Sequence, residues 1–320
     1  MTGAPLVDVD ESVVQELKQK LIDPKTTLPE KYRVLFSLRN TRGAAAHEAL
    51  ALALKDESAL FRHDVAFCLG QRQDAAAVQI LTDILHNSEE HAMVRHEAGE
   101  ALGAIGTEEC LVPLREHLDD AVLEVAETCQ LALQRIEWLK EHPDAGNEES
   151  PYYSVDPTPA LPSSTPTEQL RETLLDERKR MFDRYSALFA LRNKGGKEAV
   201  AALGAVFGAR SALLKHEVAY VMGQMQDPKA VEFLTEVLKD PSEHAMVRHE
   251  AAEALGAIAD SVTVGLLREF AKDPEPIVAH SCVVALDVLD FEQSGQLEYA
   301  DRGGDKGEAP ARRPICPCRG

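Results

Sequence analysis

Four histidine–acid pairs are the residues of this sequence whose types and spacing could do chemistry. They are His63-Asp64, His96-Glu97, His216-Glu217 and His249-Glu250. The two histidines of each half are separated by the same interval (63 to 96 and 216 to 249), and the second half repeats the first at a constant offset (63 to 216 and 96 to 249). Two imidazoles and a carboxylate form the ligand set of non-haem Fe(II) sites, and Zn²⁺ accepts the same set. The pattern therefore predicts a metal centre and leaves the metal open.

The elements that position these pairs are predicted to be the helices of a repeat array. Residues 90–105 read EHAMVRHEAGEALGAI and residues 243–258 read EHAMVRHEAAEALGAI, so that only Gly99 and Ala252 differ between the copies. A repeat period of about 33 residues indicates stacked helix pairs. The histidines fall on the second helix of each pair, which lines the concave face of such arrays. Because stacked helices lie about 8–10 Å apart, two neighbouring helices can share one ion.

A purely structural reading of the histidines competes with metal binding. They could be polar residues satisfied on the inner face of the repeats, but this does not explain why the pairs occupy only the middle repeats of each half. The matched positions in the outer repeats are Tyr32, Glu127, Tyr185 and His280. Ser281, not an acid, follows His280, so we expect His280 to be structural. We expect Glu100 and Glu253, four positions after the second histidine of each half, to support the site or to be solvated.

The chain divides into four predicted parts. A four-repeat half spans 1–141, a linker spans 142–166, a second four-repeat half spans 167–291, and a disordered tail spans 292–320. The linker contains six prolines (143, 151, 157, 159, 162 and 166), which exclude a helix or a central strand and predict an extended, exposed tether. The fold class is all-α: a superhelix of eight helix pairs whose halves are related by a pseudo-twofold axis.

Charge and composition limit the partners. The chain has 54 acidic and 34 basic residues and a formal net charge of −20. This balance disfavours nucleic acid, whose phosphates are bound by Lys and Arg, and favours a cationic partner. No basic and apolar leader is visible at the N-terminus, and no apolar run approaches the roughly 18 residues that span a bilayer. We therefore expect a cytoplasmic protein that binds neither membrane nor nucleic acid.

From about residue 10 to 300 the sequence resembles the deoxyhypusine hydroxylases, HEAT-like di-iron monooxygenases, on its four histidine–acid pairs. The resemblance implies hydroxylation of the deoxyhypusine side chain on the precursor of eukaryotic translation initiation factor 5A, which completes hypusine. It implies two Fe²⁺ ions per chain, O2 as co-substrate and an electron donor that the sequence does not identify. By resemblance, one iron is held by His63, His96 and Glu97, and the other by His216, His249 and Glu250.

The resemblance assigns the two remaining acids, Asp64 and Glu217, to binding of the substrate amine. One of them departs from the family pattern, since the family usually has Glu where this chain has Asp64. Two other functions fit the repeat array and are kept as alternatives: a non-enzymatic HEAT scaffold that binds a basic partner on its concave face, and a zinc hydrolase that uses the same ligands.

Overall fold

The computed structural model describes residues 6–143 and 150–294, which form helices joined by short turns apart from the non-helical segment 150–166. These residues contain no strand, apart from an isolated bridge between Val7 and Thr41. The outer helices are α1 (Glu11–Ile22), α3 (Ala44–Ala53), α5 (Val78–His86), α7 (Leu111–Glu116), α9 (Thr167–Leu175), α11 (Gly196–Gly204), α13 (Val231–Lys239) and α15 (Val264–Phe270). The inner helices are α2 (Leu28–Arg39), α4 (Ala59–Gln71), α6 (Ala92–Ile105), α8 (Leu123–Glu141), α10 (Met181–Lys194), α12 (Ala212–Met225), α14 (Ala245–Ile258) and α16 (Pro276–Ser294).

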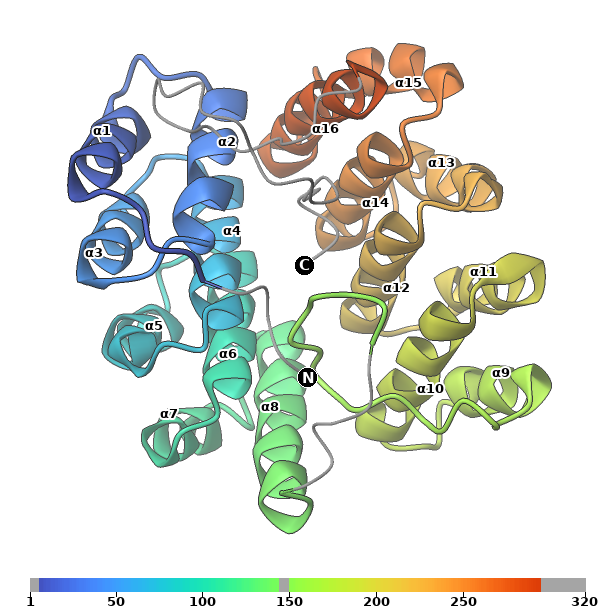
Figure 1. The fold of residues 1–320 in the computed structure, drawn as a ribbon. Helices are drawn as coiled ribbons and strands as arrows, with labels where there is room; N and C mark the ends of the chain where they lie inside the picture. Colours follow the sequence, from blue (N-terminus) through green and yellow to red (C-terminus); the bar gives the residue numbers. More distant parts are fainter. Residues whose placement is uncertain (1–5, 144–149, 295–320) are drawn as a thin grey trace.

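Each outer helix packs against the inner helix that follows it in the chain, and this confirms the all-α array of helix pairs predicted from the repeats. Figure 1 shows the inner helices facing one another around the centre of the molecule while the outer helices form its periphery. The structure carries α16 to Ser294, beyond the end predicted for the second half. The tail predicted to be disordered lies, from residue 295 on, outside the described residues.

Side-chain caps fix where the site-bearing helices begin. The Ser58 hydroxyl accepts a hydrogen bond from the Phe61 amide at the start of α4, and Ser211 caps α12 in the same way. α6 and α14 begin at an unusual cap, since His91 and His244 accept the amide hydrogens of the residues two positions ahead at 3.2 Å. These two histidines therefore serve helix initiation, which holds the first turn of each helix in place.

Neighbouring inner helices approach closely at glycines that recur in the two halves. A Cβ built on Gly103 in α6 would lie 2.6 Å from the Cβ of Ala132 in α8. The matched Gly256 in α14 would place a Cβ 2.6 Å from the carbonyl oxygen of Ala285 in α16. Only a residue without a side chain allows this spacing. The glycines therefore set the distance between the helices that carry the histidine–acid pairs and their neighbours.

The two halves contact each other at both ends, so the inner helices close into a ring. At one junction α2 packs on α16, where Arg33 donates two hydrogen bonds to the Asp287 carboxylate at 2.7 and 3.1 Å. At the other junction α8 packs on α10 and α12. Matched contacts lie at the two junctions: Ser58 with His280 Nδ1 at 3.1 Å, and Ser211 with Glu127 at 2.9 Å.

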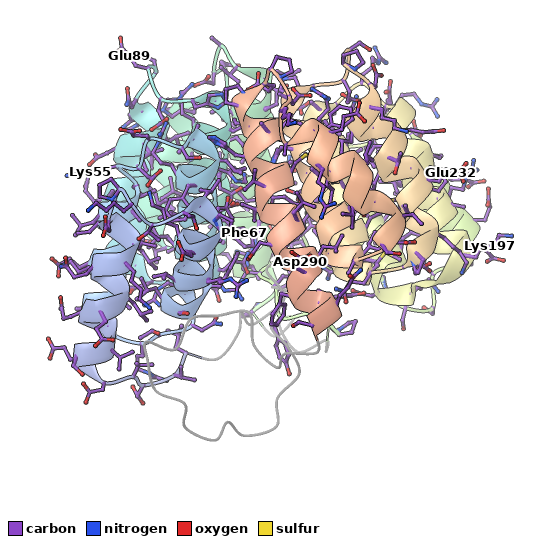
Figure 2. All side chains as sticks on the ribbon, turned by 90° about the horizontal axis from the view of Figure 1, so that it is seen from above. Lys55, Phe67, Glu89, Lys197, Glu232 and Asp290 are labelled. Atoms are coloured by element: carbon purple, nitrogen blue, oxygen red, sulfur yellow. The ribbon has the colours of Figure 1, made fainter. Side chains whose placement is uncertain are left out.

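The centre of the ring is distinguished from its rim by the kind of side chain. Figure 2 shows Lys55, Glu89, Lys197 and Glu232 at the periphery, where they are exposed, whereas Phe67 lies in the middle of the molecule. Within the described part of the chain, no helix is both long and apolar enough to cross a membrane. The burial of polar groups at the centre of the ring, in contrast to the exposed charges of the rim, needs an explanation.

Candidate metal centre

The four predicted histidines meet at the centre of the ring. His63 on α4 and His96 on α6 have ring centroids 5.5 Å apart, and His216 on α12 and His249 on α14 have centroids 5.2 Å apart. The two pairs also contact each other across the halves, with His63 5.4 Å from His249 and His96 5.5 Å from His216. All four side chains are buried, and those of His96 and His249 are fully so. One compact cluster of imidazoles therefore contains residues of both halves.

A carboxylate of each half lies beside its two histidines. Glu97 Oε2 is 3.2 Å from His63 Nε2 and 3.9 Å from His96 Nε2. In the second half, Glu250 Oε2 is 3.3 Å from His216 Nε2 and 4.0 Å from His249 Nε2. Two imidazole nitrogens therefore surround one carboxylate oxygen in each half, as the repeat analysis led us to expect.

The four Nε2 atoms are buried, and none of them has a hydrogen-bond partner among the residues that the structure describes. A buried polar atom without a partner is costly, and such atoms usually mark an ion, a water molecule or a catalytic role. Here the atoms are imidazole nitrogens that converge beside carboxylates, and imidazole together with carboxylate is the ligand set of Fe(II) or Zn²⁺. The residues present therefore fit a metal.

One group of potential ligand atoms combines residues of both halves. His216, His249 and Glu250 bring one ligand atom each within 4.8 Å of the others, and so do His63, His96 and His216. A third group, His96, Glu97 and Glu100, meets the same limit. His216 thus belongs to two groups, one of which spans both halves. Spacing in the sequence could not have indicated this, because it depends on how the halves face each other.

The ionisation of the histidines differs between positions. Burial, together with the nearby imidazoles, holds the pKa values of His96 and His249 well below the usual range, so both are neutral and able to ligate. For His63, burial also opposes the charged form, but the hydrogen bond to Asp64 and the adjacent Glu97 outweigh it and raise the pKa well above the usual range. Metal binding must displace the proton from His63, because only the neutral ring coordinates.

A pocket lined by acids opens beside the histidines. Its carboxylates come from both halves and from the segment between them: Asp64, Glu97, Glu100, Asp156, Glu217, Glu250 and Glu253. Burial is the largest cause that raises the pKa values of Glu100, Glu217 and Glu253 well above the usual range, and neighbouring carboxylates add to it. None of these three forms a salt bridge with Lys or Arg of the described residues. The pocket therefore favours a cation that would complete its charge balance.

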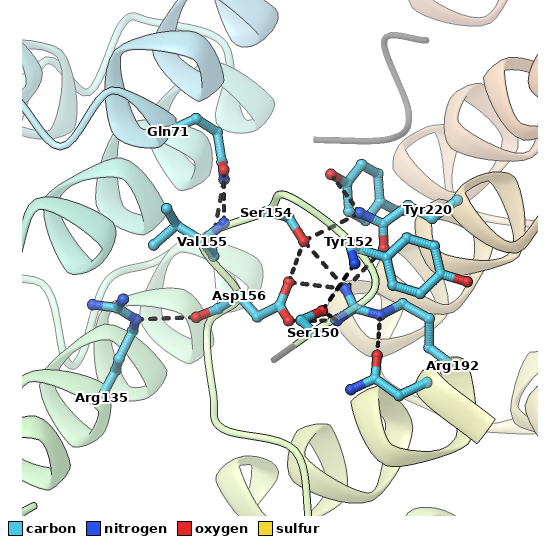
Figure 3. A network of polar contacts seen from close by, with 11 residues as sticks. Gln71, Arg135, Ser150, Tyr152, Ser154, Val155, Asp156, Arg192 and Tyr220 are labelled. Atoms are coloured by element: carbon cyan, nitrogen blue, oxygen red, sulfur yellow. Dashed lines mark hydrogen bonds and ion pairs between the residues drawn. The ribbon is translucent and has the colours of Figure 1, made fainter. Parts of the chain in front are cut away.

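One wall of the pocket is the segment between the halves, residues 154–157. Figure 3 shows Asp156 held by Arg192, which donates to its two carboxylate oxygens at 2.9 and 2.6 Å. The main chain is fixed from the first half as well, since the Val155 amide donates to Gln71 Oε1 at 2.8 Å and Arg135 donates to the Asp156 carbonyl at 3.0 Å. The segment is therefore bonded to both halves.

The expectation that the whole linker is an exposed tether is wrong for residues 154–158, which are buried. The prolines do keep this segment out of helix, as predicted. The Val155 amide, the Asp156 carbonyl and the Asp156 carboxylate are nevertheless bonded by side chains of α4, α8 and α10, and this allows an extended chain to be buried. Nothing in the spacing of the sequence identified Asp156 as the partner of Arg192.

Other residues singled out in the sequence lie outside the cluster. His280 contacts Ser58 at the junction of the halves and belongs to none of the ligand groups. Arg95 and Arg248, which directly precede the second histidine of each half, are buried and donate to Asp120 and Asp273 at 2.6 Å, and neither lines the pocket. The sequence did not suggest a role for Tyr32 at the site. In the structure its hydroxyl donates a hydrogen bond to Asp64.

Fold and site together define a HEAT-repeat protein with an internal histidine–carboxylate centre, and the model of HEAT repeats matches residues 46–134 and 200–287. The chain is 50% identical to the deoxyhypusine hydroxylase of Gallus gallus over 92% of this chain and 97% of that protein. It is 52% identical to the one of Arabidopsis thaliana over 88% and 91%. The chain belongs to the deoxyhypusine hydroxylase family, a family of enzymes. The solved structure of human deoxyhypusine hydroxylase in complex with glycerol superposes with a TM-score of 0.85 at 48% identity, over 88% of this chain and 97% of that one.

Proposed function

We propose that this enzyme hydroxylates the deoxyhypusine side chain of the precursor of eukaryotic translation initiation factor 5A, with O2 as co-substrate and two iron ions per chain. The observation that supports a metal is the set of four buried Nε2 atoms at the centre of the ring, which have no hydrogen-bond partner within residues 6–143 and 150–294. Membership of the deoxyhypusine hydroxylase family carries the reaction. The electron donor is not identified by any feature of the chain.

The proposed ligands are His63, His96 and Glu97 for one iron. For the other they are His216, His249 and Glu250. His216 also lies within reach of His63 and His96, so the two ions would be neighbours in one cluster and not separate sites. Bound iron would supply the redox chemistry that O2-dependent hydroxylation of a C–H bond requires.

The protein's own residues bind the substrate, orient it and exclude water. Deoxyhypusine carries a long cationic side chain, and the pocket beside the histidines offers carboxylates that have no Lys or Arg partner among the described residues. Glu217 is the proposed anchor for the amine, because it is buried and makes no hydrogen bond within the described part of the chain. Binding the cationic end at a fixed carboxylate would hold one carbon of the side chain at the metal centre.

The wall formed by residues 154–157 limits access of water from its side of the pocket. The wall is held by charge-assisted hydrogen bonds, so it stays in place without ligand. A dry, shaped pocket strengthens the attraction between the carboxylates and the cation. The acidic chain as a whole, with its net charge of −20, would in addition attract a basic substrate surface.

The test compares the iron content of the purified protein with that of two single variants. His249→Ala should lose most of the iron and the activity, measured as the gain of one oxygen atom by the substrate protein in mass spectrometry. His280→Ala is the control, because His280 is also on an inner helix but outside the ligand groups. This variant should keep the iron and the activity. A wild-type protein that holds zinc or no metal, or an equal loss of iron in the two variants, would contradict the proposal.

A further inference from the structure

The two halves of the site differ at one matched set of residues. In the first half, the Tyr32 hydroxyl donates to Asp64 Oδ2, and Asp64 Oδ1 lies 3.0 Å from His63 Nδ1. In the second half, the matched Tyr185 donates instead to the carbonyl oxygen of Leu213 at 3.3 Å. The acid there, Glu217, has no hydrogen bond or ion pair with the described residues. The pseudo-twofold symmetry is therefore broken at the acids predicted to bind the substrate amine.

Both carboxylate oxygens of Asp64 are already engaged by the protein. Its side chain is one methylene shorter than that of Glu217, or about 1.5 Å of reach, so it stays close to its own helix. Tyr32 cannot easily turn away, because its ring is 1% exposed and lies 5.4 Å from the ring of Phe61. The contacts of Asp64 thus face the protein rather than an incoming ligand.

The contact between Asp64 and His63 has a specific chemical consequence. A carboxylate that accepts a hydrogen bond from Nδ1 fixes the tautomer and the orientation of an imidazole, and leaves Nε2 to bind a metal. His63 Nε2 is one of the buried atoms without a hydrogen-bond partner and lies 3.2 Å from Glu97. The series of contacts from Tyr32 through Asp64 to His63 therefore ends at Nε2, the atom that would bind the metal once its proton is displaced.

We propose that Asp64, oriented by Tyr32, is a positioning residue for His63, and that the substrate amine is bound from the other half by Glu217. This inference rests on the proposed metal site. It differs from the role that resemblance implied for Asp64, which was to bind the amine directly. The unmatched contacts of Tyr32 and Tyr185 supply the controls that separate the two roles.

The test is a titration of the full-length, metal-free protein with Co²⁺, followed by visible absorption and by competition with a chelator. Loss of a carboxylate that supports a ligating histidine costs about 10- to 100-fold in metal affinity, and this is the loss expected for Asp64→Asn. Tyr32→Phe should lower the affinity in the same direction and by less. The double variant should bind Co²⁺ no more weakly than Asp64→Asn alone, because Tyr32 acts through Asp64.

Tyr185→Phe is the matched control and should leave the Co²⁺ affinity within about twofold of wild type, because the hydrogen bond of its hydroxyl among the described residues goes to a main-chain carbonyl. Glu217→Gln should also keep the Co²⁺ affinity, while in the iron-loaded enzyme it raises KM for the deoxyhypusine protein. Circular dichroism of each metal-free variant checks that the helices are intact.

Two results would overturn the inference. One is an Asp64→Asn protein that binds Co²⁺ like wild type and shows a raised KM, which would make Asp64 an amine ligand. The other is an equal effect of Tyr32→Phe and Tyr185→Phe, which would make both tyrosines merely structural. A wild-type protein that binds no Co²⁺ would instead refute the proposed metal site, so the failures of the two proposals are distinguishable.

Discussion

Replacing Asp156 by Asn would leave the guanidinium of Arg192 at the centre of the ring without its counter-charge. The Arg192 side chain is 0% exposed and that of Asp156 is 5% exposed. The substitution keeps the size of the side chain but removes one negative charge and one of two acceptor oxygens. It therefore tests the ion pair that holds the wall of the pocket, and not the packing around it.

The expected loss of stability follows from the two hydrogen bonds between Arg192 and the Asp156 carboxylate, at 2.9 and 2.6 Å. Removing one partner of a buried pair costs about 3–5 kcal/mol, because a charge stays buried alone. The cost is smaller here, because the amide oxygen of the substituted side chain can still accept one hydrogen bond from Arg192 and Gln224 accepts another at 2.9 Å. The Tyr152 ring, 4.6 Å from the guanidinium, also remains. We expect the free energy of unfolding to fall by about 2–4 kcal/mol.

Urea denaturation of the full-length, metal-free protein at pH 7, followed by far-UV circular dichroism, measures this loss. The matched control is Arg39→Met in the first half. Arg39 is 2% exposed and stacks on Phe36, but its two terminal nitrogens have no hydrogen-bond partner among the described residues. No ion pair is broken there, and the only side-chain hydrogen bond lost among the described residues is the one from Arg39 Nε to Asn40 Oδ1 at 3.2 Å, so the change should be about 1 kcal/mol or less. An Asp156→Asn protein within about 0.5 kcal/mol of wild type would refute the reasoning.

Two further predictions concern stability. Gly256→Ala should lower the free energy of unfolding by about 1–3 kcal/mol, because its Cβ would lie 2.6 Å from the Ala285 carbonyl oxygen. Gly99→Ala should raise the free energy of unfolding by up to about 1 kcal/mol, because the neighbours of its Cβ are no nearer than 3.4 Å. Thermal unfolding of the two variants tests both expectations. Burial disfavours the ionised form of Asp120, but hydrogen bonds led by Arg95 lower its pKa from 3.8 to about 2. The stability it contributes, about 1–2 kcal/mol after allowance for screening, is therefore complete above about pH 4 and lost as the pH falls towards 2. The difference in urea stability between wild type and Asp120→Asn should vanish over that range, and a difference that persists at pH 2 would contradict it.

Much of the fold follows from the sequence because the repeat constrains it. The interval from His63 to His96, repeated from His216 to His249, places each pair of histidines on neighbouring inner helices, and the structure brings all four together. Helix periodicity and local caps depend on residues close in the chain, so they can be predicted from a single sequence. The convergence of the halves needed only the further assumption that two similar arrays face each other.

What could not be predicted depends on contacts between residues far apart in the chain. The burial of Asp156 rests on Arg192 and on side chains of both halves, and no local pattern distinguishes such a segment from an exposed tether. The grouping of His216 with His63 and His96 depends on the angle between the halves. The hydrogen bond from Tyr32 to Asp64 is equally invisible, because the matched Tyr185 lies in a similar sequence (YSALFALRN against YRVLFSLRN) and has a different partner.

The contact that closes the ring has a consequence for how the protein is made. Arg33 on α2 bonds to Asp287 on α16, and 254 positions separate the two residues. A ribosome must therefore release nearly the whole chain before the ring can close, while the helix pairs of the first half can already stack as they emerge. The cluster that combines His63 and His96 with His216 is equally out of reach of a nascent first half. Assembly of the complete histidine cluster is thus a late event of biogenesis, and loading of the proposed metal centre would follow synthesis instead of accompanying it.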